Sequence, residues 1–240
     1  MNTSYMPRFS FLLRLLLFLI IPCIVIACGQ HSRDGRVDRE TNIRVINAIP
    51  DVPALDFYLD NKLYLSEVRY LENSGYSKED TGGLGFQANI SGTGTRLVDT
   101  SVGFSDNRDS TLLVFGRAND PSFLALRDDN DPASSDVGKI RIINAAFDYR
   151  RVDIYIVEGN QSIANLAPAN DGIAYRDVSR YALLTDGTYS IIATTRGSKT
   201  PIATLSNVNI KGEGVYSLII ADGLPLSPST HPKLVFLTDR

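Results

Sequence analysis

The sequence predicts an all-β protein with two tandem immunoglobulin-like β-sandwich domains. Three observations lead to this prediction. The apolar segments are short and rich in β-branched residues, no segment keeps a sustained helical period, and one unit of sequence occurs twice. A chain of 240 residues has room for two domains of about 100 residues, each large enough for its own apolar core.

The composition excludes two broad classes of protein. With 43% hydrophobic and 21% charged residues, the chain is too apolar to be disordered throughout. Its net charge is −3, so there is no basic excess to neutralise a phosphate backbone. We therefore expect a folded protein that does not bind nucleic acid.

The first 28 residues have the pattern of an export signal. Arg8 and Arg14 precede an uncharged apolar run over residues 15–27, and polar sequence follows Cys28 directly. The run has the length of a signal-peptide apolar region and is shorter than the ~20 residues that a membrane-spanning helix needs. The alternative is an uncleaved N-terminal helix anchor in which Cys28 is incidental.

Residues 25–28, Val-Ile-Ala-Cys, resemble a bacterial lipobox. The resemblance implies cleavage before Cys28, a diacylglycerol on its sulfur, and an acyl chain such as palmitate on the new amine. Several acyl chains make a stable anchor, whereas one binds a membrane only marginally. Gly29 in place of an aspartate resembles the pattern for transport to the outer membrane of Gram-negative bacteria. We therefore expect a lipoprotein attached to the cell envelope through Cys28, with Cys23 removed and no disulfide in the mature chain.

An internal repeat is the most informative feature of the sequence. Residues 43–59 and 140–156 align without a gap at an offset of 97 residues. The identical pairs are Ile43/Ile140, Arg44/Arg141, Ile46/Ile143, Asn47/Asn144, Ala48/Ala145, Asp51/Asp148, Asp56/Asp153 and Tyr58/Tyr155. A match of this quality indicates two copies of one structural unit.

Later segments extend the repeat and set the domain boundaries. Residues 95–117 resemble 200–222, and residues 122–129 resemble 233–239. Turn-forming residues 128–136 separate the two copies. The predicted parts are a signal peptide at 1–27, a lipidated cysteine and flexible tether at 28–40, a first sandwich at 41–130, a linker at 131–137 and a second sandwich at 138–240. We expect the two sandwiches to be arranged like beads on a lipid tether.

Each unit is expected to contain about seven short strands. Residues 152–156 alternate between core-type apolar residues and other side chains, which is the period of a half-buried strand, and residues 55–59 repeat this pattern. Residues 62–73 have apolar residues at helical spacing, but they fit a strand and a loop equally well.

Residues 44–58 are similar to the opening of a bacterial family called domain of unknown function 4397. The second copy departs from that pattern at Phe147 and Arg150, where the first copy has prolines. The segment Gly-Thr-Tyr-Ser-Ile at 187–191 also fits the family, and the first copy has no clear counterpart of it. The resemblance covers most of residues 41–240. It implies secreted or surface-anchored β-sandwich modules and no known activity.

Eight residues shared by both copies are candidate structural positions. They are Asn47, Asp51, Asp56 and Tyr58 in the first copy, and Asn144, Asp148, Asp153 and Tyr155 in the second. The asparagine and the first aspartate of each copy flank a predicted turn, where their side chains can bond backbone amides. The second aspartate of each copy falls on the non-core face of a strand. A paired-carboxylate active site and a calcium role are the alternatives.

The sequence predicts no catalytic residue, metal ion or cofactor. Residues 128–136 could offer oxygen ligands to calcium, but they lack the glycine and distal glutamate of an EF-hand loop and fit a solvated linker. His31 and His231 have no partner histidine at metal spacing. The sequence contains no GxSxG elbow and no glycine-rich phosphate loop after a strand.

We therefore interpret the chain as a lipid-anchored, non-catalytic binding or structural module with an unknown protein or glycan ligand. The alternative is a hydrolase that acts on envelope polysaccharide or peptide. Two close carboxylates in a cleft would favour the enzyme. Exposed tyrosines would favour binding, and Tyr149, Tyr175 and Tyr181 are candidates because they fall in or near predicted loops.

Overall fold

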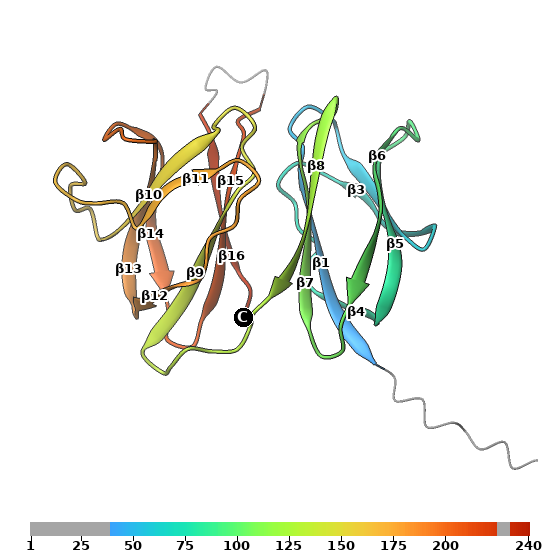
Figure 1. Ribbon diagram of the computed structural model, residues 1–240, viewed down its shortest axis with the longest axis horizontal. Helices are drawn as coiled ribbons and strands as arrows, with labels where there is room; N and C mark the ends of the chain where they lie inside the picture. The colour runs from blue at the N-terminus through green and yellow to red at the C-terminus, as the bar shows by residue number, and fades with distance from the viewer. Residues whose placement is uncertain (1–38, 225–230) are drawn as a thin grey trace, which may run out of the picture. The chain divides into compact units, whose positions relative to one another are not determined.

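The computed structural model describes residues 39–224 and 231–240, and these residues confirm the predicted fold class (Figure 1). They form sixteen β-strands in four four-stranded sheets and contain no helix, so no membrane-spanning helix is found in this part of the chain. Two sheets make each immunoglobulin-like sandwich, and residues 39–240 constitute one compact unit. The predicted signal peptide, Cys28 and nearly all of the tether lie outside the described residues.

The first sandwich packs the sheet β4-β1-β7-β8 against the sheet β3-β2-β5-β6. Its strands are β1 (Glu40–Ala48), β2 (Leu55–Leu59), β3 (Lys62–Val68), β4 (Ser77–Asp80), β5 (Gly82–Ile90), β6 (Arg96–Phe104), β7 (Asp109–Arg117) and β8 (Asp120–Asp128). The segment at residues 62–73 is therefore a strand followed by a loop, and not a helix.

The second sandwich has the same strand order, with β12-β9-β15-β16 packed against β11-β10-β13-β14. Its strands are β9 (Val137–Asn144), β10 (Arg151–Glu158), β11 (Asn170–Ala174), β12 (Ala182–Thr185), β13 (Gly187–Thr195), β14 (Pro201–Ile210), β15 (Val215–Ala221) and β16 (Lys233–Thr238). Each sandwich thus has eight described strands where about seven were expected. The edge strands β4 and β12 are four residues long, which is too short to show a strand period in the sequence.

The first and seventh strands of each sandwich are parallel neighbours. β1 pairs with β7 and β9 pairs with β15, and the strands between them in sequence make the long connection that a parallel pair requires. The register places Arg44 beside Thr111 and Arg141 beside Ser217.

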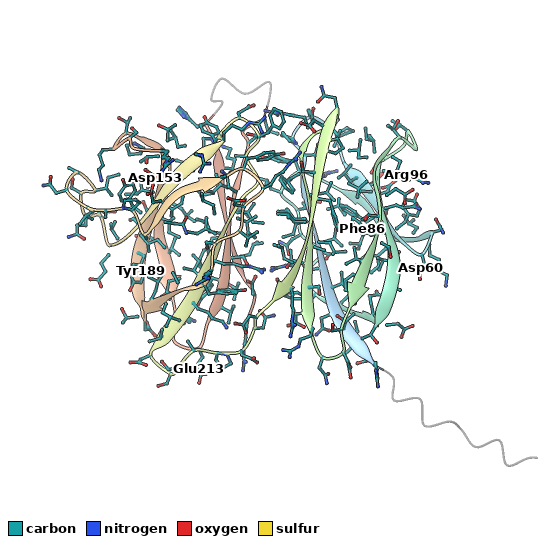
Figure 2. The ribbon with its side chains drawn as sticks, viewed as in Figure 1. Asp60, Phe86, Arg96, Asp153, Tyr189 and Glu213 are labelled. Atoms are coloured by element: carbon teal, nitrogen blue, oxygen red, sulfur yellow. The ribbon has the colours of Figure 1, made fainter. Side chains whose placement is uncertain are left out.

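The facing sheets of each sandwich enclose its core. Ile43 and Val45 of β1 and Leu112 of β7 point into the first core, where they meet Phe86 of β5 (Figure 2). The second core is built in the same way around β9 and β15. Burying one such side chain contributes about 1.5–3 kcal/mol, so the two cores are the main source of stability.

A third apolar cluster joins the two sandwiches. The alternate residues of β1 and β7, among them Ile46 and Phe115, pack with their counterparts in β9 and β15, among them Ile143 and Ile219. These four strands are consequently buried on both faces, which explains why their sequences are apolar at nearly every position. The shared cluster differs from the expected beads, because each sandwich covers a face of the other.

Candidate functional site

Four charged side chains are buried where the two sandwiches meet. Arg44 donates to the carboxylate of Asp239 at 2.7 Å, and Arg141 donates to the carboxylate of Asp128. The side chains of both arginines are 3% exposed, and those of both aspartates are 0% exposed. Each ion pair joins an arginine of one sandwich to an aspartate of the other. We call these four residues the central charge cluster.

A hydroxyl group from each sandwich completes the central charge cluster. Thr111 accepts a hydrogen bond from the arginine of its own sandwich at 2.9 Å and donates to the aspartate of its own sandwich at 2.7 Å. Ser217 does the same in the second sandwich, at 2.8 and 2.6 Å. The two halves of the cluster are therefore equivalent, and every buried charge has at least two polar partners.

Two tyrosines flank the central charge cluster. Tyr76 donates to Asp128 at 2.6 Å, and its ring centroid lies 4.6 Å from the Arg44 guanidinium. Burial and the charge of Asp128 raise the pKa of Tyr76, and burial raises the pKa of Tyr181 to about 12 although Arg141 opposes the shift. Burial by itself lowers the pKa of Arg141, but the charge and hydrogen bond of Asp128, together with Tyr181 and Asp239, outweigh burial and the net shift is upward. At neutral pH both tyrosines are therefore protonated and Arg141 is charged.

This geometry gives the central charge cluster a structural role. Its carboxylates already accept hydrogen bonds from arginine and hydroxyl donors and lie out of contact with solvent, whereas a general acid or base must reach its substrate. Removing one partner of a buried ion pair costs about 3–5 kcal/mol because the other charge is left uncompensated. Any docking of the two sandwiches that separates these pairs therefore carries that penalty.

The repeated asparagines hold the chain that follows β1 and β9. The Asn47 side chain accepts the N–H of Ile49 at 2.9 Å and donates to the carbonyl of Val68 at 2.9 Å. In the second sandwich, the Asn144 side chain accepts the N–H of Ala146 at 3.1 Å and donates to two further carbonyls. Both asparagines are fully buried, so both amides act on the backbone and neither faces a ligand.

The repeated aspartates after these turns have different partners in the two copies. Asp51 accepts the N–H of Ala118 at 3.1 Å, whereas Asp148 pairs with Arg117 of the first sandwich at 2.5 Å. The buried Asp222 accepts the N–H groups of residues 147 and 148, each at 3.0 Å. Burial raises the pKa of Asp222, although the N–H of Asp148 and the charge of Arg117 oppose the shift. Sequence reasoning missed Asp222, whose only signal is a carboxylate directly after the apolar run of β15.

Asp56 and Asp153 lie on the strand face opposite each core. Asp56 accepts the N–H of Glu67 at 2.8 Å. Asp153, labelled in Figure 2, accepts the N–H groups of Gly172 at 2.6 Å and Gly197 at 2.7 Å, which ties β10 to β11 and to the turn after β13. Both carboxylates are thus engaged with the backbone, 97 residues apart in sequence, and do not form a pair.

Within residues 39–224 and 231–240, the tyrosines do not form an exposed patch. Tyr155 is only 2% exposed, whereas its repeat partner Tyr58 is partly exposed. Tyr175 is 9% exposed and belongs to the cluster between the sandwiches, so it is not available for stacking on a ligand. Tyr149 and Tyr181 are partly buried. The loop positions of these residues in the sequence therefore did not predict exposure.

A groove of about 350 Å³ runs beside β10 in the second sandwich. One side is the strand itself, and the other is the loop over residues 159–169. The lining residues are Tyr155, Ile156, Val157, Glu158, Gln161, Leu166, Ala167, Ala169 and Tyr189. The volume is at the lower end of the range for ligand sites, and the lining combines apolar side chains with one exposed carboxylate. We call this feature the β10 groove.

The loop that bounds the β10 groove is held against the sheet. Ile163 is 7% exposed and packs with Tyr155 and Val157 on the outer face of β10, and Leu166 packs against the same cluster. Lys199 donates to the hydroxyl of Tyr155 at 3.0 Å and to the carbonyl of Leu166. The far wall of the groove is therefore anchored to β10 by apolar and polar contacts.

The edge of β10 inside the groove has no partner strand among the described residues. β11 pairs with β10 only as far as Ile154, which faces Asn170. Continuing this register would place Pro168 opposite Ile156, and proline has no N–H to donate. Gly159 donates to the carbonyl of residue 188 in the register of the β10–β13 pair, so in this antiparallel pair the N–H and C=O groups of Ile156 and Glu158 point away from β13, toward the groove.

The corresponding edge in the first sandwich is fully paired. β2 turns through Asp60 and Asn61, both in the left-handed region with φ of 46° and 62°, and returns directly as β3 (Figure 2). Leu59 then faces Lys62, and β3 covers β2 over its whole length. A two-residue hairpin turn of this kind closes the edge. The β10 groove is therefore a feature of the second sandwich that its sister lacks.

No metal centre is formed by the described part of the chain. No group of three or more His, Cys, Asp or Glu side chains is placed there to hold a metal ion.

In the connection between the sandwiches, Asp129 pairs with Lys139 at 2.9 Å, and this hydrogen bond is the main cause that lowers the pKa of Asp129.

Residues 41–155 match the family model described as Domain of unknown function (DUF4397). The match spans the first sandwich, β9 and most of β10, and it agrees with the resemblance seen in the first copy. No curated protein matches the chain.

Three solved structures are among those similar to the chain. A family 26 carbohydrate-binding module from Eubacterium rectale, in complex with maltoheptaose, has a TM-score of 0.25 at 12% identity, covering 84% of this chain and 97% of that one. A candidate cell adhesion protein from Bacteroides fragilis has a TM-score of 0.23 at 10% identity, with coverage of 85% and 98%. A leucine-rich repeat protein from Bacteroides thetaiotaomicron has a TM-score of 0.21 at 10% identity, with coverage of 78% and 26%. TM-scores this low carry no argument, so the fold rests on the strand order.

Proposed function

We propose that the chain is an envelope-anchored, non-catalytic binding module whose ligand site is the β10 groove. The observation that carries this proposal is the difference between the two sandwiches. Both have the same strand order, but β3 pairs with β2 over its whole length, whereas β11 leaves β10 unpaired beyond Ile154, where the groove lies. The fold does not require this unpaired backbone edge, because the first sandwich is built with the same strand order and pairs the corresponding strand fully.

The non-catalytic part of the proposal is supported by where the described carboxylates lie. Asp128 and Asp239 are buried in ion pairs, and Asp56 and Asp153 bond the backbone. Glu158 is the one carboxylate that lines the β10 groove, so the groove offers no pair of carboxylates for acid–base hydrolysis.

The proposal also includes a lipid anchor and a second family copy. The lipobox-like residues 25–28 motivate attachment of the protein to the outer membrane through Cys28. The equal strand orders and the repeated residues motivate treating residues 138–240 as a second copy of the family domain.

Two experiments test the proposal separately. For the anchor, the Cys28→Ser variant should lose lipid labelling and leave the membrane fraction; labelling that persists would contradict it. For the groove, the full chain and its Ala169→Trp variant are applied to glycan and peptide arrays. Ala169 is exposed and lines the groove, whereas Ala164 is exposed on the same loop and does not line it, so Ala164→Trp is the control. Binding that only Ala169→Trp abolishes supports the groove, and binding that both variants retain refutes it.

A further inference from the structure

We infer that the β10 groove binds an extended polypeptide by strand addition, an inference that rests on the proposed binding function and names its ligand class. The unpaired N–H and C=O groups of Ile156 and Glu158 lie along the groove wall. Such an edge is a template for an incoming strand, which supplies the missing donors and acceptors in alternation. Two residues of an antiparallel peptide would satisfy all four groups.

The first sandwich shows the kind of occupant that fits. There, β3 occupies the edge that the second sandwich leaves open, with Lys62 opposite Leu59. Leu59 is the repeat partner of Ile156, since the two copies align at an offset of 97 residues. The occupant of the groove therefore has the position of the first two or three residues of β3, which is an extended backbone and not a ring.

The charge and the shape of the β10 groove indicate which peptide side chains fit it. Glu158 is exposed at the end of the groove, and no ion pair of the described residues involves it. A lysine or arginine in the peptide, at the place that Lys62 takes in β3, would lie next to this carboxylate. The apolar wall of Ile156, Leu166 and Ala167 suits a branched aliphatic side chain beside it.

A glycan fits the same features less well. Sugar recognition commonly uses an exposed aromatic face, but the two tyrosines of the groove, Tyr155 and Tyr189, are only 2% and 5% exposed. Their rings are covered by Lys199 and by the second core. The groups that the groove offers to a ligand are backbone amides, which a peptide strand matches in spacing.

The test uses the full chain in detergent and a fluorescein-labelled peptide with the sequence of residues 61–68, Asn-Lys-Leu-Tyr-Leu-Ser-Glu-Val. Binding is followed by fluorescence anisotropy. A second peptide carries N-methyl groups on alternate amides, so it keeps every side chain and loses the N–H donors along the edge that would pair with β10. We expect saturable binding of the first peptide and at least tenfold weaker binding of the second.

Variants locate the binding site. Ala169→Trp, which fills the groove, and Glu158→Lys, which reverses its charge, should each weaken the peptide by at least tenfold. Ala164→Trp and Asp177→Lys change exposed residues outside the groove and should leave binding unchanged. Thermal melts show whether each variant folds.

Three outcomes would overturn the inference. They are no saturable binding of the peptide, equal binding of the N-methylated peptide, and equal binding by the Ala169→Trp and Glu158→Lys variants. Groove-dependent binding on a glycan array with no peptide binding would overturn the peptide inference while leaving the binding function intact. If the full chain bound nothing on the glycan array and nothing on the peptide array, the binding function itself would be contradicted.

Discussion

Replacing Arg44 by methionine should destabilise the protein far more than breaking an ion pair on the surface does. Arg44 and Asp239 have side chains that are 3% and 0% exposed, so the variant leaves Asp239 buried with only a hydroxyl donor and a second guanidinium at 3.9 Å. Breaking a buried pair in this way costs about 3–5 kcal/mol, a large share of the roughly 5–15 kcal/mol by which domains are stable. The pair of Lys78 and Glu40 provides the control, because its side chains are 71% and 48% exposed. Lys78→Met should cost no more than about 1 kcal/mol.

The assay is urea unfolding at pH 7, followed by far-UV circular dichroism and by the fluorescence of the 11 tyrosines, since the chain has no tryptophan. The midpoint should fall strongly for Arg44→Met and hardly at all for Lys78→Met, with little change in slope. Replacing both Arg44 and Asp239 by apolar residues should recover much of the loss, because no charge is then left unpaired. The reasoning would be refuted if Arg44→Met and Lys78→Met lowered the free energy of unfolding by similar amounts.

Three further predictions concern other parts of the fold. The pKa of Tyr181 is raised from 10.0 to about 12, so between these pH values the folded state keeps a proton that the unfolded state loses. The free energy of unfolding should therefore fall between pH 10 and pH 12, and it should fall less steeply in the Tyr181→Phe variant. A Cβ at Gly212 would lie 1.9 Å from the carbonyl oxygen of Ser135, so Gly212→Ala should cost about 1–3 kcal/mol, whereas Gly103→Ala, which meets nothing within 4 Å, should be tolerated in the same melts. Residues 39–130 expressed alone should form a homodimer by light scattering, because the apolar face that meets the second sandwich would otherwise be exposed; a monomer at high concentration would contradict this.

The repeat and the fold class are predictable from the sequence for a clear physical reason. Residues 43–59 and 140–156 each form a strand, a turn and a second strand. In the second strand, the alternation of apolar with other residues indicates which face is buried. The buried asparagines of the turn, Asn47 and Asn144, also stand out because they recur at the offset of the repeat. Local patterns therefore suffice for elements whose partners are close in sequence.

The packing of one sandwich on the other is harder to predict from the sequence, although the sequence contains a signal for it. Strands β1, β7, β9 and β15 are apolar on both faces, whereas β2 and β10 are alternating, and a sandwich that stands alone needs only the second pattern. Arg44 and Arg141 obscure this signal, because an arginine in a strand suggests a solvent-facing side. Their true partners, Asp239 and Asp128, are 195 and 13 residues away in sequence, so no local period connects them.

The β10 groove is still harder to predict from the sequence, because it depends on the residue at which β11 stops pairing with β10. The repeat predicts a hairpin after β10 like the one after β2, and the sequence shows only that eleven residues replace a two-residue turn. Whether such a loop continues the sheet or departs from it rests on backbone hydrogen bonds. Pro168 is the one residue whose chemistry indicates that the ladder ends.

The central charge cluster also explains why the two copies occur on one chain. In each half, an arginine bonds a hydroxyl of its own sandwich and the carboxylate of the other, so the arrangement is the one that a two-fold symmetric dimer of a single sandwich would have. In such a dimer Arg44 would meet Asp128 of a second copy. Dissociation would then expose an apolar face and leave charges without partners, and the dissociated fraction would increase on dilution. The short connection over residues 129–136 makes the same association intramolecular and independent of concentration. One copy can therefore open the edge of its outer sheet at β10 without loosening the interface, because the two features lie on opposite sheets of the second sandwich.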